Sequence, residues 1–254
     1  MMSKGIDVAG LEHSFRARGG AVPALDRIDL AIEPGELVTL AGPSGCGKTT
    51  FLRMIAGFVA PSSGTITVGG TTVRGPGVDR GVVFQQPTLY PWLDVRRNVA
   101  LGPKLRGVGK AERRATADRY LSLVGLSDAA DRRPYELSGG MQQRAQIARV
   151  LAGDPEVVLM DEPYGALDAL TRERLQNELL TLWRETGKTI LFITHSVDEA
   201  VFLGSRVLVM SPRPGRIVLD EKVPFSSRSL APDEIRALPE FAETAARVRA
   251  AIAP

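Results

Sequence analysis

The sequence predicts an α/β fold with a parallel sheet core, an antiparallel β subdomain and an inserted α-helical subdomain. Unbroken apolar runs alternate with helical segments, which favours a parallel sheet covered on both faces. These runs are 157–160, 189–194 and 206–210. Apolar and polar residues alternate between Ile6 and Ile32, which is typical of antiparallel strands. The stretch from Gln85 to Asp154 shows neither strand pattern and indicates the helical insertion.

The remaining elements follow from local patterns. Short strands are expected at 64–70 and 81–84. Helices are expected at 110–124, 138–152, 170–185 and 233–250. In the first of these helices we expect Ala115, Tyr120, Leu121 and Val124 to be buried, and in the third Leu175, Leu179, Leu182 and Trp183 share one face. Gly187 follows the third helix, as a C-terminal glycine should.

Composition narrows the function. The chain has 254 residues, 44% of them hydrophobic and 24% charged, which is ordinary for a soluble globular protein. A net charge of +3 is too small to argue for nucleic-acid binding. The one cysteine excludes an internal disulfide or a cysteine-based zinc site. No signal peptide or membrane-spanning run is present, so we expect a cytosolic protein that reaches any membrane through a partner.

The central motif is the stretch from Gly42 to Thr49, which fits G-x-x-x-x-G-K-[S/T] between an apolar strand and a helix start. Glycines allow successive backbone N–H groups to point at phosphate oxygens, and the helix N-terminus adds partial positive charge. Lys48 can reach the β- and γ-phosphates, and the Thr49 hydroxyl can bind Mg²⁺. The alternative is a glycine-rich turn with an incidental lysine. The motif favours a P-loop NTPase core of the RecA-like type.

A second candidate site lies where the apolar run 157–160 ends in Asp161 and Glu162. In a protein that also has a phosphate loop, an aspartate at a strand end is suited to bind Mg²⁺. A glutamate directly after it is suited to act as a base that polarises the attacking water. The alternative is an acidic turn after a strand.

The stretch Leu137-Ser138-Gly139-Gly140, followed by Gln142 and Arg144, discriminates between nucleotide-binding classes. Ser138 can cap the following helix, and the plain alternative is a capped helix start without a ligand. Leu-Ser-Gly-Gly with Gln-x-Arg, after a phosphate loop and shortly before Asp161 and Glu162, resembles the signature of ATP-binding cassette (ABC) ATPases.

This resemblance covers about residues 6–225 and implies the roles of further residues. It implies that Gln85 contacts Mg²⁺ and the water, that His195 contacts the γ-phosphate, that Phe15 stacks on adenine, and that Asp168 belongs to a loop crossing a dimer interface. The catalytic set is then Glu162, His195, Gln85 and Lys48, and the metal set is Thr49, Gln85 and Asp161. The nucleotide-binding set is Phe15, Gly42, Pro43, Ser44, Gly45, Cys46, Gly47, Lys48, Thr49, Thr50, Ser138, Gly139, Gly140 and Asp168. Two departures are small, since Tyr164 replaces a commoner Phe and Ser196 replaces a commoner Asp after His195.

The resemblance also implies an assembly. Two cassettes pair head to tail, and residues 138–140 of one close on ATP held by the phosphate loop of the other. The expected domains are an ATPase domain at 6–225, with a helical subdomain at about 87–153, and a helical C-terminal extension at 226–254. A DNA-repair ATPase would need a long coiled coil, and a translation-factor cassette usually occurs in tandem. Neither feature is present, so these soluble ATPases remain only as the alternative.

The segment Gln86–Val99 points to a transporter group. Its Leu-x-Pro-Trp core, ending at Trp92, resembles importers for nitrate, aliphatic sulfonates and taurine, where this region receives the membrane subunit. Trp92 as a core aromatic is the alternative. We therefore expect an ATP- and Mg²⁺-dependent importer subunit at the cytoplasmic face of the inner membrane. Its partners would be a second ATPase copy, permease subunits at Gln86–Val99 and, indirectly, a solute-binding protein, with no nucleic acid.

Overall fold

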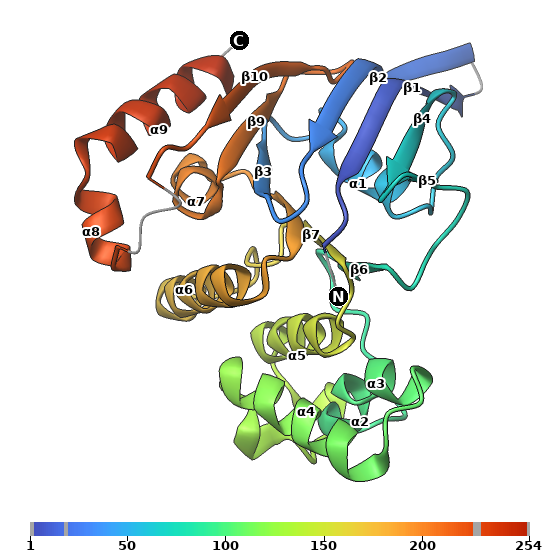
Figure 1. The fold of residues 1–254 in the computed structure, drawn as a ribbon, viewed down its shortest axis with the longest axis vertical. Helices are drawn as coiled ribbons and strands as arrows, with labels where there is room; N and C mark the ends of the chain where they lie inside the picture. The colour runs from blue at the N-terminus through green and yellow to red at the C-terminus, as the bar shows by residue number, and fades with distance from the viewer. Residues whose placement is uncertain (1–2, 18–19, 226–229, 253–254) are drawn as a thin grey trace. The chain divides into compact units, whose positions relative to one another are not determined.

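Figure 1 shows the computed structural model, which describes residues 3–17, 20–225 and 230–252. The chain forms two compact units. The first contains the residues up to 77 and those from 183 onward, and the second contains residues 78–182. Within the described ranges, no helix combines the length and hydropathy that crossing a bilayer requires.

An antiparallel sheet forms the first part of the first unit. Its strands are β1 (Ile6–Ala17), β2 (Gly20–Ile32), β4 (Ser63–Val68) and β5 (Thr71–Thr72), in the order β2-β1-β4-β5. Ile6 of β1 lies opposite Ile32 of β2 on one side and Val68 of β4 on the other. All three side chains are buried, as the alternating pattern predicts. The predicted antiparallel strands between Ile6 and Ile32 are thus confirmed.

The second sheet of this unit holds the buried strands. β3 (Leu37–Ala41) pairs in parallel with β8 (Thr189–Ile193) and with β9 (Arg206–Met210), and β10 (Ile217–Lys222) pairs antiparallel to β9. Every residue of β3 and β8 is buried, as expected for parallel strands covered on both faces. Helix α1 (Lys48–Ile55) packs near β8, and α7 (Val197–Leu203) packs on β3 and β9. Figure 1 shows α9 (Pro239–Ile252) beside α7, with the short α8 (Pro232–Ala237) before it.

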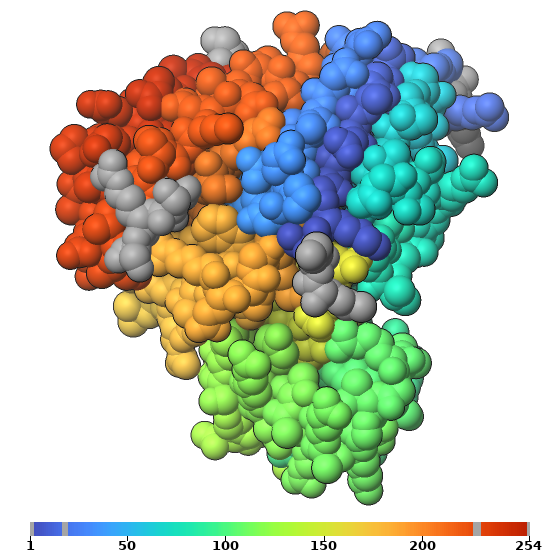
Figure 2. All heavy atoms as spheres, viewed as in Figure 1, coloured from blue at the N-terminus to red at the C-terminus, as the bar shows by residue number. Residues whose placement is uncertain are grey.

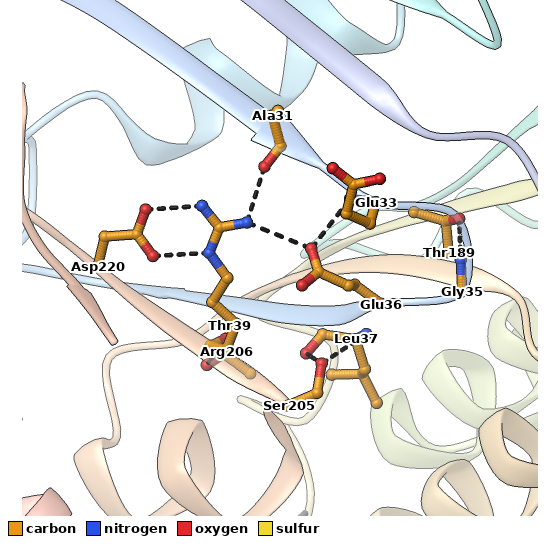
Figure 3. A network of polar contacts seen from close by, with 10 residues as sticks. All are labelled: Ala31, Glu33, Gly35, Glu36, Leu37, Thr39, Thr189, Ser205, Arg206 and Asp220. Carbon is orange, nitrogen blue, oxygen red and sulfur yellow. Dashed lines mark hydrogen bonds and ion pairs between the residues drawn. The ribbon is translucent and has the colours of Figure 1, made fainter. Parts of the chain in front are cut away.

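Arg206 ties the two sheets of this unit together (Figure 3). Its guanidinium donates twice to the Asp220 carboxylate, at 2.6 Å each, and also to the carbonyl of Ala31 at 2.7 Å and to Glu36 Oε2 at 3.2 Å. The hydrogen bonds to Asp220 raise the pKa of Arg206, although partial burial opposes them. One side chain therefore joins the end of β2, the turn before β3, and β10.

The second unit is mainly helical. Its two strands, β6 (Arg80–Val83) and β7 (Val157–Asp161), are parallel neighbours. Helices α2 (Val95–Val99), α3 (Leu101–Leu105) and α4 (Lys110–Leu123) pack around α5 (Gly139–Ala152). Two short 3₁₀ turns, Ser127–Ala129 and Pro134–Glu136, connect α4 to α5. In the space-filling view, the green and yellow-green spheres of these helices form one packed mass (Figure 2).

Two details of the predicted helices are wrong. Ala115 is exposed, and α4 instead buries Ala117 with Tyr120, Leu121 and the following Val124. These four positions have the i, i+3, i+4, i+7 spacing of one helix face, which Ala115 does not share. The single terminal helix predicted at 233–250 is two helices, α8 and α9, because Pro239 starts a new helix after an extended Leu238.

The predicted end of α6 is confirmed, whereas the domain boundaries stay predictions. Helix α6 (Ala169–Thr186) buries Leu175, Leu179 and Leu182, and it ends before Gly187, whose φ is 58°. Helices α2 to α5 lie between Val95 and Ala152, within the predicted insertion at 87–153. The domain boundaries themselves stay predictions, and residues 226–229 and 253–254 of the predicted extension lie outside the described residues.

Candidate active site

The phosphate loop connects the buried strand β3 to helix α1 through a backbone conformation that favours glycine. The φ angles of Gly42, Gly45 and Gly47 are 153°, 77° and 113°. A Cβ on Gly42 would lie 2.6 Å from the carbonyl oxygen of Met210, and one on Gly47 would lie 2.6 Å from Leu25 Cδ2. At Gly45 a Cβ would meet no atom within 4 Å, so this part of the loop faces open space. The loop is therefore packed at its two ends and open between them.

Lys48 places a cation inside this loop. Its side chain is largely buried, and Nζ donates to the carbonyl oxygens of Gly42 at 2.8 Å and Pro43 at 2.9 Å. Cys46 Sγ lies 3.8 Å from the same nitrogen. A buried ammonium requires such partners, and here they are the dipoles of the loop itself. The loop thus holds a positive charge in a cradle of its own backbone carbonyls.

The N-terminus of α1 completes the cradle. The N-cap residue is Gly47, which makes no side-chain hydrogen bond to the first turn. Thr49 and Thr50 are half-buried in that turn, and Ser44 is exposed. An uncapped helix N-terminus with a lysine beside it is suited to bind phosphate oxygens. The residues predicted to hold the nucleotide phosphates therefore fit a polyanionic ligand.

His195 lies at the same edge of the sheet as the phosphate loop. β3 and β8 are parallel neighbours in which Leu40 pairs with Ile193, so their carboxyl ends lie side by side. His195 follows β8 and is exposed. The next residue, Ser196, accepts a hydrogen bond from Glu199 N at 3.3 Å and so caps α7. The serine at this position therefore fixes the turn that carries His195.

Thr194 fixes the other side of this turn. Its hydroxyl bonds the buried carboxylate of Glu199 and accepts from the backbone N–H of Ser196 at 3.0 Å. Its own N–H donates to Leu40 O at 3.2 Å. His195 thus extends from a backbone that is held on both sides.

The second unit brings Gln85 and Glu162 together. The strands that precede them are parallel neighbours, with Val83 opposite Met160. Gln85 Nε2 donates to Glu162 Oε2 at 3.3 Å. Asp161 is buried at the end of β7, whereas Glu162 is half-buried and has a φ of 45°. A non-glycine residue in this left-handed region stores local strain, which proteins concentrate at functional sites.

The signature stretch forms an exposed helix start. Ser138 caps α5 by accepting a hydrogen bond from Met141 N at 3.3 Å. Gly139 is exposed, and a Cβ on it would meet no atom within 4 Å. Gln142 Nε2 donates to Pro134 O and Leu137 O, at 3.0 and 3.2 Å, which holds the preceding turn. The helix N-terminus is thus rigid and accessible.

Asp168 and Phe15 are both accessible. Asp168 accepts a hydrogen bond from Thr171 N at 2.9 Å at the start of α6, and this bond lowers the pKa of its carboxyl.

Phe15 is 43% exposed, and its ring packs edge-on against His13 with centroids 4.6 Å apart. Burial lowers the pKa of His13. The ring of Phe15 therefore has a supported face and a free surface on which a base can stack.

Trp92 is not a core residue, since 67% of it is exposed. The segment Gln86–Val99 is instead held by Asn98, which is fully buried. Its Oδ1 accepts from Tyr90 N at 2.8 Å, and its Nδ2 donates to the carbonyls of Tyr90, Leu93 and Asp94. Interpreting Trp92 as a core aromatic is therefore wrong. The loop is an ordered surface that presents the indole outward.

Side chains that we did not single out from the sequence support Gln85. Gln143, Gln146 and Arg149 of α5 all bind the backbone on either side of it, at Phe84 or Thr88. The signal available in the sequence is their spacing of three residues on a helix whose other buried positions are apolar. Their targets lie about sixty residues earlier in the chain, so no local pattern identifies them.

The predicted metal set belongs to different units. Thr49 is in the first unit, and Gln85 and Asp161 are in the second. Each offers an oxygen ligand of the kind that Mg²⁺ prefers. Among the described residues, no group of three or more His, Cys, Asp or Glu side chains is placed to hold a metal.

Comparison with known proteins identifies close relatives. A family model described as "ABC transporter" matches residues 25–165. The chain is 50% identical over 240 residues to "Taurine import ATP-binding protein TauB" of Roseobacter denitrificans, covering 93% of this chain and 90% of that protein. It is 53% identical over 231 residues to the protein of the same name from Chromobacterium violaceum, covering 90% and 88%.

A solved structure shares the fold. It is a dimeric post-hydrolysis state of the ATP-binding cassette MJ0796 bound to ADP and Pi. The TM-score is 0.78 with 32% sequence identity, and the match covers 86% of this chain and 98% of that one. The predicted fold class, a P-loop core with antiparallel and helical additions, is confirmed.

Proposed function

This chain belongs to the ATP-binding subunits of ABC transporters, and we propose that its transporter imports taurine or a related alkanesulfonate. The family resemblance predicted from the sequence is confirmed. The chain is the ATP-hydrolysing subunit of an ABC importer, and the alternative of a DNA-repair or translation ATPase finds no support.

The observation that carries the substrate proposal is the set of relatives. Three relatives at 50%, 52% and 53% identity carry the name of a taurine import ATP-binding protein. The Leu-x-Pro-Trp core of the segment Gln86–Val99 supports the same group. Nitrate is the competing anion within that group. The transported molecule binds other subunits, so no residue of this chain is proposed to touch it.

We propose that ATP binds with Mg²⁺ at the residues described above. The backbone cradle of Gly42–Thr49 and the ammonium of Lys48 would hold the phosphates, and Phe15 would stack on the adenine. Thr49, Gln85 and Asp161 would hold Mg²⁺, which neutralises phosphate charge and orients the reacting groups. The donor chemistry fits, because hydroxyl, amide and carboxylate oxygens are hard ligands.

Each of the remaining site residues has a proposed role in ATP hydrolysis. Glu162 would accept a proton from water on its carboxylate as the water oxygen bonds to the γ-phosphorus and the bridging P–O bond to ADP breaks. Gln85, which already donates to Glu162, would orient the same water. His195 would stabilise the charge on the γ-phosphate from the end of β8. Lys48 would stabilise it from the phosphate loop.

The working unit is a dimer in the related cassette structures. We propose a homodimer in which residues 138–140 of one copy face the ATP of the other. The accessible start of α5 supports this proposal, because its Gly139 has open space around it and its first turn carries helix-dipole charge. Asp168, exposed at the start of α6, would lie at the same interface.

A surface of the second unit is suited to bind the permease. A cavity of about 290 Å³ is lined by residues that include Tyr90, Leu101 and Val150. Several exposed apolar side chains lie in this cavity wall or in the Gln86–Val99 loop, namely Val78, Trp92 and Leu105 at 98%, 67% and 79% exposure. Exposed apolar groups of this kind mark interaction sites. We propose that a helical segment of the permease docks here, which holds the chain at the cytoplasmic face of the inner membrane.

Reconstitution tests the substrate proposal. The chain would be assembled with its genomically adjacent permease and solute-binding protein in proteoliposomes, and ATP hydrolysis would be measured with taurine, ethanesulfonate or nitrate. We expect taurine or ethanesulfonate to stimulate hydrolysis and nitrate not to do so. Stimulation by nitrate alone would overturn the proposed substrate class and leave the ATPase assignment intact.

A further inference from the structure

We propose that Thr88, Gln146 and Arg149 form a clamp that positions Gln85 for ATP hydrolysis. We call these three residues the Thr88 clamp. The proposal deepens the proposed function and rests on the role that it gives to Gln85. The clamp residues are positioning residues, since they act through Gln85 and its backbone.

The first part of the support lies before Gln85. The carbonyl oxygen of Phe84 accepts two hydrogen bonds, from Gln143 Nε2 at 3.0 Å and from Gln146 Nε2 at 2.7 Å. Both glutamines are buried, with 1% and 0% exposure. A carbonyl that accepts hydrogen bonds from two buried amides has little freedom to rotate, so the residue before Gln85 is fixed to α5.

The second part lies after Gln85. Gln146 Oε1 accepts hydrogen bonds from both the backbone N–H and the hydroxyl of Thr88, each at 2.8 Å. Arg149 donates to the carbonyl of Thr88 at 2.8 Å and to its hydroxyl at 2.9 Å. All three polar groups of Thr88 are therefore bound by α5.

Gln146 connects the two parts. Its amide donates to Phe84 and accepts from Thr88, so one side chain holds the chain at both ends of a three-residue span containing Gln85. A span this short and fixed at both ends leaves few backbone conformations. From this fixed backbone, the side chain of Gln85 donates to Glu162 Oε2 at 3.3 Å.

Arg149 extends the clamp toward the proposed permease surface. Its guanidinium lies over the ring of Tyr90, 5.3 Å from the centroid, and both residues line the 290 Å³ cavity. The same helix is capped at its N-terminus by Ser138, part of the proposed contact with the second copy. A change at the cavity wall therefore has a direct polar connection to the backbone that carries Gln85.

Substitutions at Thr88 test the clamp in the full-length chain. Thr88→Val removes the hydroxyl but keeps the side-chain shape, so it breaks two of the four hydrogen bonds that join Thr88 to Gln146 and Arg149. We expect kcat for ATP hydrolysis to fall about tenfold, which corresponds to about 1.4 kcal/mol, with KM for ATP within about twofold. Thr88→Ser keeps the hydroxyl and should recover most of kcat. Thr181→Val is the matched control, because the Thr181 hydroxyl bonds only its own helix at Asn177 O.

Amide hydrogen exchange supplies a readout that reports on the clamp directly. Gln146→Met removes the acceptor of the Thr88 N–H, so we expect faster exchange at Thr88 together with the lower kcat. A fall in thermal stability with kcat and KM changed in parallel would indicate a general structural role and would overturn the proposal.

Gln85→Ala separates failure of the clamp from failure of the proposed function. If Gln85→Ala lowers kcat and Thr88→Val does not, the clamp is wrong and the role of Gln85 stands. If Gln85→Ala leaves kcat unchanged, the proposed role of Gln85 is wrong, and the clamp is overturned with it as a device for hydrolysis.

Discussion

The phosphate loop and the Gln85–Glu162 region differ in how the structure holds them. The cation of Lys48 is bound by carbonyls five and six residues earlier in the same loop. Gln85 contacts a carboxylate 77 residues away, and the backbone around it is held by side chains 58 to 62 residues away. The first region is thus organised by its local sequence, whereas the second depends on tertiary packing. A substitution that perturbs packing should therefore lower kcat for ATP hydrolysis more than it weakens ATP binding.

The largest expected effect belongs to the second region. Glu162→Gln keeps the shape of the side chain and removes its basicity, so we expect kcat to fall by about 10²- to 10⁴-fold while ATP binding is retained. A closed dimer should accumulate with ATP, which size-exclusion chromatography would detect. Glu243→Gln on the exposed side of α9 is the control. Normal turnover by Glu162→Gln would contradict the assignment of the base.

Lys48→Ala perturbs the first region. The loss of one charged hydrogen-bonding group should weaken ATP binding about 10- to 100-fold, as measured by calorimetry. Lys110→Ala, an exposed lysine at the start of α4, should bind ATP normally. If Lys48→Ala and wild type bound ATP with equal affinity, the assignment of the loop to the ATP-binding site would be contradicted. If kcat alone fell, the proposed contrast between a binding region and a hydrolysis region would be wrong.

The same contrast explains what the sequence alone could predict. The phosphate loop is recognisable because glycine conformation, lysine and helix start all fall within eight residues. The separate roles of Gln85 and Glu162 were predicted from two strand ends together with the family resemblance, whereas the contact between them was not. Gln146 and Arg149 were missed because their partners are distant in the chain, and nothing local distinguishes a clamping glutamine from a solvated one. The break at Pro239 could have been expected from the sequence, because the residue before a proline disfavours the helical conformation, but the prediction ran one helix through it.

Gly47→Ala tests how strongly backbone conformation and packing against β2 constrain the first region. The new Cβ would lie 2.6 Å from Leu25 Cδ2, at a φ of 113° that alanine rarely adopts. We expect a loss of about 1–3 kcal/mol in the free energy of unfolding, measured by urea denaturation. Gly75→Ala is the control, since a Cβ there meets no atom within 4 Å and its φ is not positive. Equal stability of the two variants would mean that the loop relaxes at little cost.

Asp168→Asn gives the smallest expected effect and tests the local side of the comparison at another helix start. The hydrogen bond from Thr171 N lowers the carboxyl pKa of Asp168 in the folded chain. A lowered folded pKa stabilises the fold above the unfolded pKa, and this stabilisation is lost as pH falls through the folded value. We therefore expect wild type to exceed Asp168→Asn slightly in Tm between pH 5 and 7, and the difference to shrink as pH falls below the unfolded carboxyl pKa of about 3.9. Asparagine can still cap the helix, so the variant changes only the charge. A Tm difference that stays constant as pH falls through this range would show that the ionised carboxylate is not its source.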